Sequence, residues 1–269
     1  MLFDEAEFSG YGCANYENRL VAFFDVLGWR NEIERAGSDS RRIGRLYAIT
    51  KIFESAVATT PSQFPSVQVT SFSDCVVVSV PYDPTVVQQW IEALGRIQIS
   101  LALLGFWIRG AVTVGELIHD SISVFGPALN RAYELETRYA IFPRILVDEK
   151  VSWETLGLID LEGGLRFIDP FKIELLKRVA QAAPNPAALQ HFNSIAGTAL
   201  HASPLKISGE IMLLLIFGRL SNALERASEE KVPEKYAWWH ARIAPRVSAI
   251  DLPSDFKAVF SKIMFGEPA

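Results

Sequence analysis

Several chemistries are made improbable by what this chain has little of. Its 269 residues include two cysteines, Cys13 and Cys75, which form no CxxC pair. The four histidines are scattered and have neither HExxH nor triad spacing, so we expect them to be structural or exposed. These absences argue against a zinc site and against a disulfide framework. No Walker A loop occurs either, which argues against a P-loop nucleotide site.

The chain also lacks a basic excess and a long hydrophobic run. Lys and Arg number 26 against 31 Asp and Glu, so the net charge of −5 does not favour a nucleic-acid polymer as partner. Residues 1–10 are polar and acidic and do not resemble a secretory signal. The longest apolar run, Ile211–Phe217, is much shorter than the ~20 residues of a membrane-spanning helix. We therefore expect a cytoplasmic protein with no membrane partner.

Hydrophobic residues make up 49% of the chain, enough for a sizeable core. Periodicity and turn residues predict strands at 19–28, 67–72, 75–80, 107–117, 122–125 and 144–148, and helices at 41–57, 84–104 and 126–139. The two runs around Ser73-Asp74 predict a tight hairpin. Further helices are predicted at 171–182, 186–196, 206–227 and 234–243.

This order predicts an α+β, ferredoxin-like domain with an antiparallel or mixed sheet and helices packed on one face. We expect an N-terminal segment at 1–18, the α+β domain at 19–168, and a helical C-terminal extension at 169–269.

Two aspartates are the main candidates for chemistry. Asp25 ends an apolar strand, where a carboxylate is costly to bury unless it is paired or bound to metal. Asp74 lies at the hairpin turn. If the hairpin pairs beside the first strand, both carboxylates emerge at one sheet edge, an arrangement suited to Mg²⁺ or Mn²⁺ with substrate phosphates. Alternatively, Asp25 caps the following helix and Asp74 only forms the turn.

Four segments, in order, resemble class III adenylyl and guanylyl cyclases. They are Phe23–Trp29 (FFDVLGW), Ser71–Asp74 (SFSD), Arg109–Glu116 (RGAVTVGE) and Phe125–Asn130 (FGPALN). The last three are closest to the pyrimidine cyclases of the bacterial Pycsar anti-phage system. The resemblance implies a cyclase fold that converts UTP or CTP into a 3′,5′-cyclic nucleotide. It also implies a head-to-tail homodimer with shared sites, and a separate effector that responds to the product.

The resemblance implies roles for individual residues. Asp25 and Asp74, with Val26 beside them, would hold two divalent ions, Mg²⁺ or Mn²⁺. Asn130 would act at the transition state from the partner subunit. Arg109 would supply a cation, although a structural ion pair is an equal alternative. The residues expected at the substrate are Phe24, Val26, Leu27, Gly28, Tyr47, Thr70, Ser123 and Phe125.

The chain departs from the purine cyclases in its base-reading positions. Adenylyl cyclases carry Lys and Asp where this chain has Thr70 and Ser123, and the Glu/Cys pair of guanylyl cyclases is also absent. Tyr47 could fill the volume that a smaller pyrimidine leaves, although a half-buried helix residue is the simpler interpretation. Glu134 replaces the Arg that usually follows the Asn by four residues; Arg131 and Arg138 are nearby.

Other functions stay open. A purine cyclase with an unusual pocket is one, and a catalytically degenerate cyclase-fold nucleotide sensor, favoured by Glu134, is another. A ferredoxin-like RNA-binding module is disfavoured, because the strands lack interleaved basic and aromatic residues. Between the pyrimidines, the resemblance favours UTP over CTP.

Overall fold

A computed structural model describes residues 15–58, 66–152, 157–172, 209–227 and 233–250. Its strands are β1 (Glu17–Val26), β2 (Gln68–Phe72), β3 (Cys75–Pro81), β4 (Ile108–His119), β5 (Val124–Phe125), β6 (Ile145–Val147), β7 (Ile159–Glu162) and β8 (Leu165–Ile168). Its helices are α1 (Trp29–Ala36), α2 (Ser40–Ala58), the 3₁₀ turn η2 (Pro84–Val86), α3 (Val87–Leu103), α4 (Pro127–Tyr139), α7 (Gly209–Ala227) and α8 (Pro233–Ser248). The predicted α+β class with a mixed sheet is confirmed.

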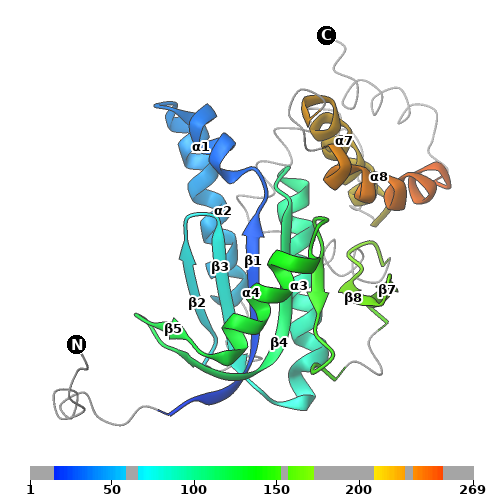
Figure 1. Cartoon of the computed structure of the whole chain (residues 1–269). Coiled ribbons are helices and arrows are strands. Elements are labelled where there is room, and N and C mark those ends of the chain that lie inside the picture. Colours follow the sequence, from blue (N-terminus) through cyan, green and yellow to red (C-terminus); the bar gives the residue numbers. More distant parts are fainter. Residues whose placement is uncertain (1–14, 59–65, 153–156, 173–208, 228–232, 251–269) are drawn as a thin grey trace.

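The sheet is built around β1 (Figure 1). It has 8 strands in the order β2-β3-β1-β4-β6-β8-β7, with β5 pairing with β4. β1 is antiparallel to both β3 and β4, whereas β4 and β6 are parallel. β1 lies between two partner strands, and its apolar run is buried on both faces, as expected for a central strand.

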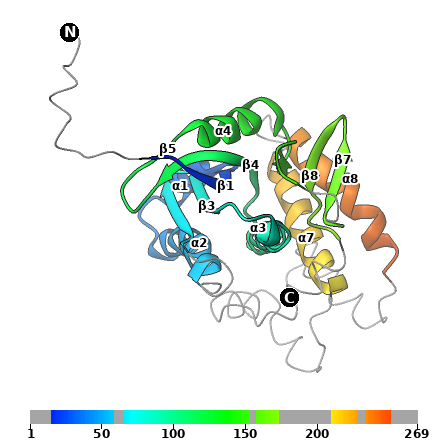
Figure 2. The same cartoon turned by 90° about the horizontal axis from the view of Figure 1, so that it is seen from below.

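Helices cover both faces of the sheet, so the prediction of helices on one face was wrong. Leu20, Ala22 and Phe24 of β1 pack with α2 and α3, whereas Val21 and Phe23 pack with α4. Figure 2 shows α4 on one side of the strands and α2 and α3 on the other. Alternate residues of a strand point to opposite faces, and β1 is apolar at nearly every position, so its pattern was compatible with two covered faces.

The helix starts follow their sequence signals. The Asp83 side chain accepts a hydrogen bond from the Thr85 N–H (2.8 Å), with Pro84 opening η2. Gly126 precedes α4 with φ 148° and its approach to the Glu116 carbonyl leaves no room for a Cβ. Pro245 lies inside α8, which therefore continues beyond the predicted end at 243.

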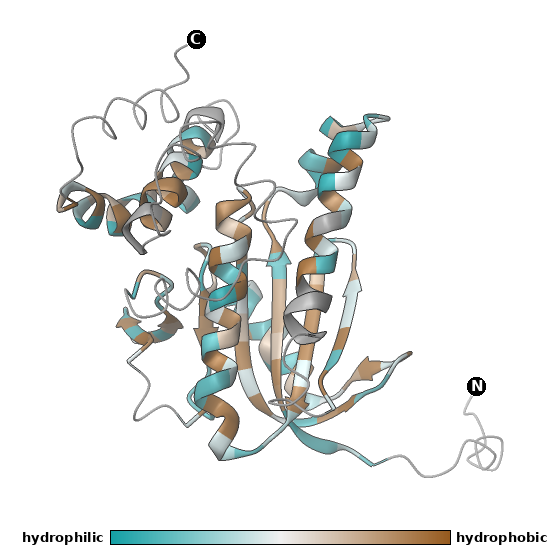
Figure 3. Ribbon diagram, turned by 180° about the vertical axis from the view of Figure 1, so that it is seen from behind, coloured by the Kyte–Doolittle hydropathy of each residue, from teal (hydrophilic) through white to brown (hydrophobic). Residues whose placement is uncertain are grey.

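The largest core cluster lies between the strands and the α2–α3 layer, where the strands are mainly hydrophobic (Figure 3). α7 and α8 pack beside α3, and Trp239 of α8 lies edge-on to Trp107 and Phe171. The helices expected at 171–182 and 186–196 fall almost entirely outside the described residues. The division of the chain at 168/169 stays a prediction. Over the described residues, no helix is long and apolar enough to cross a bilayer.

Candidate active site

The β2–β3 hairpin places Asp74 beside Asp25. β3 pairs with β1 so that Cys75 lies opposite Asp25. Ser73 turns the chain with a left-handed φ of 53°, and the Val26 N–H donates to the Asp74 carbonyl (2.9 Å). This hydrogen bond fixes the hairpin turn to the end of β1, so the two carboxylates share one edge.

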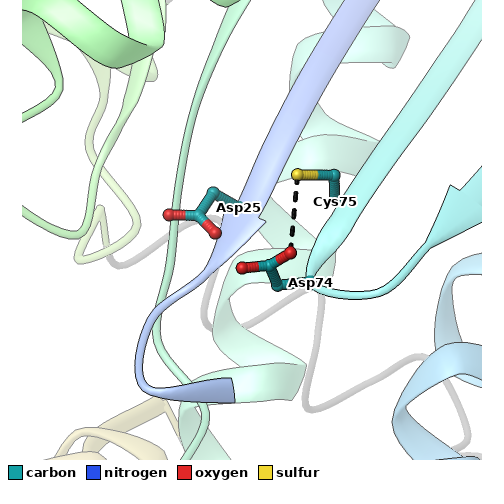
Figure 4. A group of neighbouring side chains, drawn as sticks. All are labelled: Asp25, Asp74 and Cys75. Carbon is teal, nitrogen blue, oxygen red and sulfur yellow. Dashed lines mark hydrogen bonds between the residues drawn. The ribbon is translucent and has the colours of Figure 1, made fainter. Parts of the chain in front are cut away.

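Asp25, Asp74 and Cys75 form a cluster that could hold a metal ion (Figure 4). One ligand atom from each residue lies within 4.8 Å of the others. Burial, together with the charges of Asp74 and Asp25, raises the pKa of the Cys75 thiol to about 12. The protonated thiol lies 3.7 Å from Asp74 Oδ1, to which it can donate. The available ligands are therefore carboxylate oxygens, which fit Mg²⁺ or Mn²⁺ better than a thiolate-seeking metal.

Arg109 of β4 lies between two carboxylates. Its Nε donates to Asp25 Oδ2 at 2.7 Å, and Glu136 Oε1 of α4 lies 2.7 Å from the same nitrogen, off the N–H direction. Thr137 donates to the other Glu136 oxygen, whereas Oε1 is buried with no hydrogen-bond partner among the described residues. Burial raises the pKa of Glu136. The site thus carries more acceptor capacity than Arg109 satisfies.

A second arginine–carboxylate pair anchors α4 to β6. Arg131 donates from Nε and Nη2 to the two oxygens of Asp148, at 3.0 and 3.1 Å, and Thr113 donates to Oδ2 at 2.7 Å. Burial alone would raise the pKa of Asp148, but the hydrogen bonds from Arg131 and Thr113 lower it below its usual value. This pair holds the helix that carries Asn130.

Asn130 is exposed and is not brought to the aspartates within one chain. α4 begins beside Glu116 and Leu117, near the start of β1, and reaches Arg109 only at Glu136 in its second half. The six residues from Asn130 to Glu136 span ~9 Å along the helix axis. Within one chain, Asn130 is thus offset along α4 from the part of the helix that reaches Arg109.

Thr70, one of the two expected base-reading residues, lies on the α4 face of the sheet. The Thr70 hydroxyl oxygen is 3.0 Å from His119 Nε2, and Ser79 Oγ is 2.8 Å from His119 Nδ1. Ser123 lies in the turn before β5, where its N–H donates to Asp120 Oδ1 (2.7 Å). Phe125 is half-exposed.

The other expected substrate residues lie at the end of β1, in the turn that follows it, or on α2. Phe24 and Val26 bury their side chains on the opposite face, and the Leu27 N–H donates to the Trp107 carbonyl. Gly28, with φ 74°, begins α1. The structure does not bring Tyr47 to the cluster. Tyr47 lies on α2, across the sheet, with 63% of its surface exposed and Lys51 over its ring.

Sequence reasoning missed Glu136 and the involvement of His119. Glu136 follows Ala128 and Ala132 at intervals of four, so an acid on the apolar stripe of α4 was a readable signal. His119 gave no such signal, because its partners Thr70 and Ser79 come from two other strands.

Comparison of the sequence with family models and with curated proteins finds no match. Among solved structures, the chain is similar to the adenylyl cyclase CyaB from P. aeruginosa, with 12% identity, 58% of this chain and 96% of that chain covered, and a TM-score of 0.42. A bacterial light-regulated adenylyl cyclase is 12% identical, with 60% of this chain and 54% of that chain covered and a TM-score of 0.40, so this chain spans about half of that one. The catalytic core of a rhodopsin-guanylyl cyclase with converted specificity, in complex with ATPalphaS, is 12% identical. The match covers 58% of this chain and 96% of that chain, with a TM-score of 0.38. Matches of this strength establish neither a family nor an activity.

Proposed function

We propose that this chain is a pyrimidine nucleotide cyclase, which converts UTP, or CTP as second choice, into the 3′,5′-cyclic nucleotide and pyrophosphate. The observation that carries the proposal is the convergence of Asp25 and Asp74 at the end of β1. The resemblance of the sequence motifs supplies the reaction, and the carboxylate pair supplies the means of holding a metal-bound triphosphate.

In the proposed reaction, the ribose 3′-oxygen bonds to the α-phosphorus while the bond between that phosphorus and the α–β bridging oxygen breaks. Asp25 and Asp74 would hold two divalent ions, Mg²⁺ or Mn²⁺. When bound, such ions lower the pKa of the 3′-hydroxyl and neutralise the leaving pyrophosphate. The proton of the 3′-hydroxyl passes to solvent, and the nucleotide keeps its α-phosphate in the new ring.

In this proposal, the Arg109 guanidinium group can pair with either of two carboxylates, Asp25 or Glu136. In the structure its Nε–H points at Asp25, which is where a cation would bind. Glu136 Oε1, which accepts no hydrogen bond from the described residues, lies 2.7 Å from the same nitrogen and offers Arg109 another acceptor. Arg109 can therefore turn from Asp25 to Glu136 and remain close enough to stabilise phosphate charge.

The proposal includes a homodimer with sites shared between subunits. Asn130 is exposed, so it is accessible to a neighbouring copy of the chain. Large apolar side chains are exposed on the same part of the molecule, with Ile122 at 90%, Tyr133 at 54% and Phe125 at 49%. An interface over these residues would bury them and deliver Asn130 to the partner's aspartates.

The choice of a pyrimidine rests on Thr70 and Ser123, which are short hydroxyl side chains at the base-reading positions. The cyclic product would serve as a second messenger in bacterial anti-phage defence, acting on a separately encoded effector. This biological role derives from the sequence resemblance alone.

The experiment is product identification. The purified protein is incubated with ATP, GTP, UTP and CTP together in Mn²⁺, and the products are analysed by mass spectrometry. We expect cyclic UMP, or cyclic CMP, with equimolar pyrophosphate. A cyclic purine as the main product would contradict the pyrimidine assignment while leaving cyclisation intact.

Two variants tie any product to the site. Asp25→Ala should abolish turnover, because it removes a metal ligand, while Glu149→Gln removes an exposed acid outside the cluster and should be fully active. Circular dichroism checks that both variants are folded. Substantial activity in folded, metal-supplemented Asp25→Ala would refute the site.

A second candidate is a nucleotide sensor without turnover. The observation that favours it is Glu134, which stands at the usual arginine position and is engaged by Arg138 at 2.8 Å and Arg131 at 3.4 Å. A sensor would bind a triphosphate and metal at the aspartates without releasing pyrophosphate. Tight binding of UTP with no pyrophosphate over many hours would favour it.

A further inference from the structure

A hydrogen-bonded row of polar side chains joins four strands on the face of the sheet that packs against α4. It runs from Arg19 of β1 through Ser79 of β3 and His119 of β4 to Thr70 of β2. The first three are buried, with 3%, 0% and 7% of their surfaces exposed, whereas Thr70 is partly exposed. Of these four side chains, only that of Thr70 is therefore accessible to a ligand.

The direction of the first hydrogen bonds is fixed by arginine, which can only donate. Arg19 Nε donates to Ser79 Oγ at 2.9 Å. The hydroxyl hydrogen of Ser79 is buried and needs an acceptor, and His119 Nδ1, 2.8 Å away, can provide one. The opposite direction would leave that hydrogen buried without an acceptor, at a cost.

The next hydrogen bond follows from the charge of His119. Burial, reinforced by the charge of Arg19, lowers the pKa of His119 to about 4, so the ring is neutral at neutral pH and carries one hydrogen. Since Nδ1 accepts from Ser79, that hydrogen is on Nε2 and is donated to Thr70 Oγ1 at 3.0 Å. Thr70 therefore keeps its own hydroxyl hydrogen, for which the described part of the chain shows no acceptor.

Thr70 lies on the same face of the sheet as Asp25. It pairs with Val77, and two residues later Phe72 pairs with Cys75, which pairs with Asp25. Phe72 shares this face and is 61% exposed. An exposed aromatic ring beside a free donor suits a flat heterocycle that stacks on the ring and offers an acceptor at its edge.

We propose that Arg19, Ser79 and His119 hold Thr70 as a hydrogen-bond donor, and that this donor selects uracil over cytosine. Uracil presents a carbonyl oxygen at position 4, where cytosine presents an amino group. The Thr70 hydroxyl donates its free hydrogen to this carbonyl. Pairing with the amino group of cytosine would use only the second lone pair of Oγ1 and would leave the hydroxyl hydrogen without an acceptor. Thr70 contacts the base, whereas the other three are positioning residues. The inference rests on the proposed function, since it assumes a pyrimidine triphosphate at this face.

The test compares kcat/KM for UTP and CTP in the full-length protein, with Kd for both nucleotides from calorimetry in Mn²⁺. We expect the wild type to prefer UTP. Thr70→Val keeps the shape but removes the donor, so the UTP/CTP ratio should fall about tenfold, the value of one hydrogen bond. Thr70→Ser restores the hydroxyl and should restore the ratio.

Ser79→Ala tests the hydrogen bonds that position Thr70, and not Thr70 itself. Without the Ser79 donor, Nδ1 no longer has to accept, so the His119 hydrogen is free to move to it. The UTP/CTP ratio should fall, although Thr70 is unchanged. The control, Ser71→Ala, removes an exposed hydroxyl from the opposite face of β2 and should leave the ratio unchanged.

The possible results separate the two proposals. A wild type that prefers CTP, or a UTP/CTP ratio that Thr70→Val does not change, overturns the selection of uracil and leaves the cyclase standing. A wild type that forms no cyclic nucleotide from any triphosphate overturns the proposed function. In that case, a preference for binding UTP that Thr70→Val removes would still support the role of Thr70.

Discussion

Two arginine–carboxylate pairs connect the sheet with α4, and they differ in how fully their acceptors are used. Asp148 receives two hydrogen bonds from Arg131 and one from Thr113, in a buried and well-matched arrangement. At the other pair, Asp25 and Glu136 compete for a single nitrogen of Arg109, and one Glu136 oxygen accepts no hydrogen bond within the described part of the chain.

The difference distinguishes a structural contact from a site that is ready to bind. A saturated buried pair gains nothing from a ligand and loses much when broken. A pair with spare acceptors beside a second carboxylate, Asp74, can gain a cation at little structural cost. We therefore expect changes at Asp148 to affect stability first, and changes at Asp25 and Asp74 to affect activity first.

The largest expected effect is on turnover in Asp74→Asn. This change keeps the size of the side chain but weakens a metal ligand, so cyclic nucleotide formation should fall ~10³-fold, equivalent to ~4 kcal/mol. The melting temperature should stay close to that of the wild type, because Asp74 lies in a partly exposed turn. A variant that loses stability together with activity would remove the contrast between the pairs.

The next effect is on folding in Asp148→Ala. Removing this carboxylate leaves Arg131 and Thr113 without their buried acceptor, so the free energy of unfolding should drop by about 3 kcal/mol. Urea denaturation followed by circular dichroism measures it. If Asp148→Ala were as stable as the wild type, the saturated pair would not be the anchor of α4.

A smaller effect is expected from His119 as the pH falls. Its pKa is lowered from 6.5 to about 4, so between these values the unfolded chain binds the proton more readily than the folded one. Stability is thus lost as the pH falls from 7 to 5, by about 2 kcal/mol from this residue. His119→Gln should lose correspondingly less over that range in urea denaturation at each pH. An equal loss in both proteins would contradict a buried neutral ring.

The smallest effect should be on cation affinity in Glu136→Gln. Without the negative charge of this carboxylate, position 136 attracts Arg109 less and Arg109 competes more strongly for Asp25, so the Kd for Mn²⁺ should rise about tenfold, ~1.4 kcal/mol. Glu134→Gln removes the same charge from a more exposed position on α4 and serves as the control. Equal Kd values in wild type and Glu136→Gln would show that Arg109 does not compete with the cation.

Local patterns predicted much of the frame that holds the aspartates. The apolar run of β1, the hairpin at Ser73-Asp74 and the α4 start at Gly126-Pro127 all lie where their turn and periodicity signals indicated. These features depend on residues that are neighbours in sequence, so a single amino-acid sequence was sufficient to predict them.

Features that depend on distant residues were harder to predict. The prediction that the helices pack on one face of the sheet was wrong, because a strand that is apolar on both sides does not say which helix covers which side. The Arg109–Glu136 contact joins β4 to α4, and the His119 contacts join three strands. Periodicity reports that a residue is buried, but not which partner it meets.

The most direct measurement is Mn²⁺ binding to the full-length chain, followed by electron paramagnetic resonance. We expect the wild type to bind Mn²⁺, with affinity increased by UTP, and we expect Asp25→Asn and Asp74→Asn each to lose this binding while remaining folded. Unchanged Mn²⁺ binding in both folded variants would show that these carboxylates are not the metal ligands, and would contradict the account.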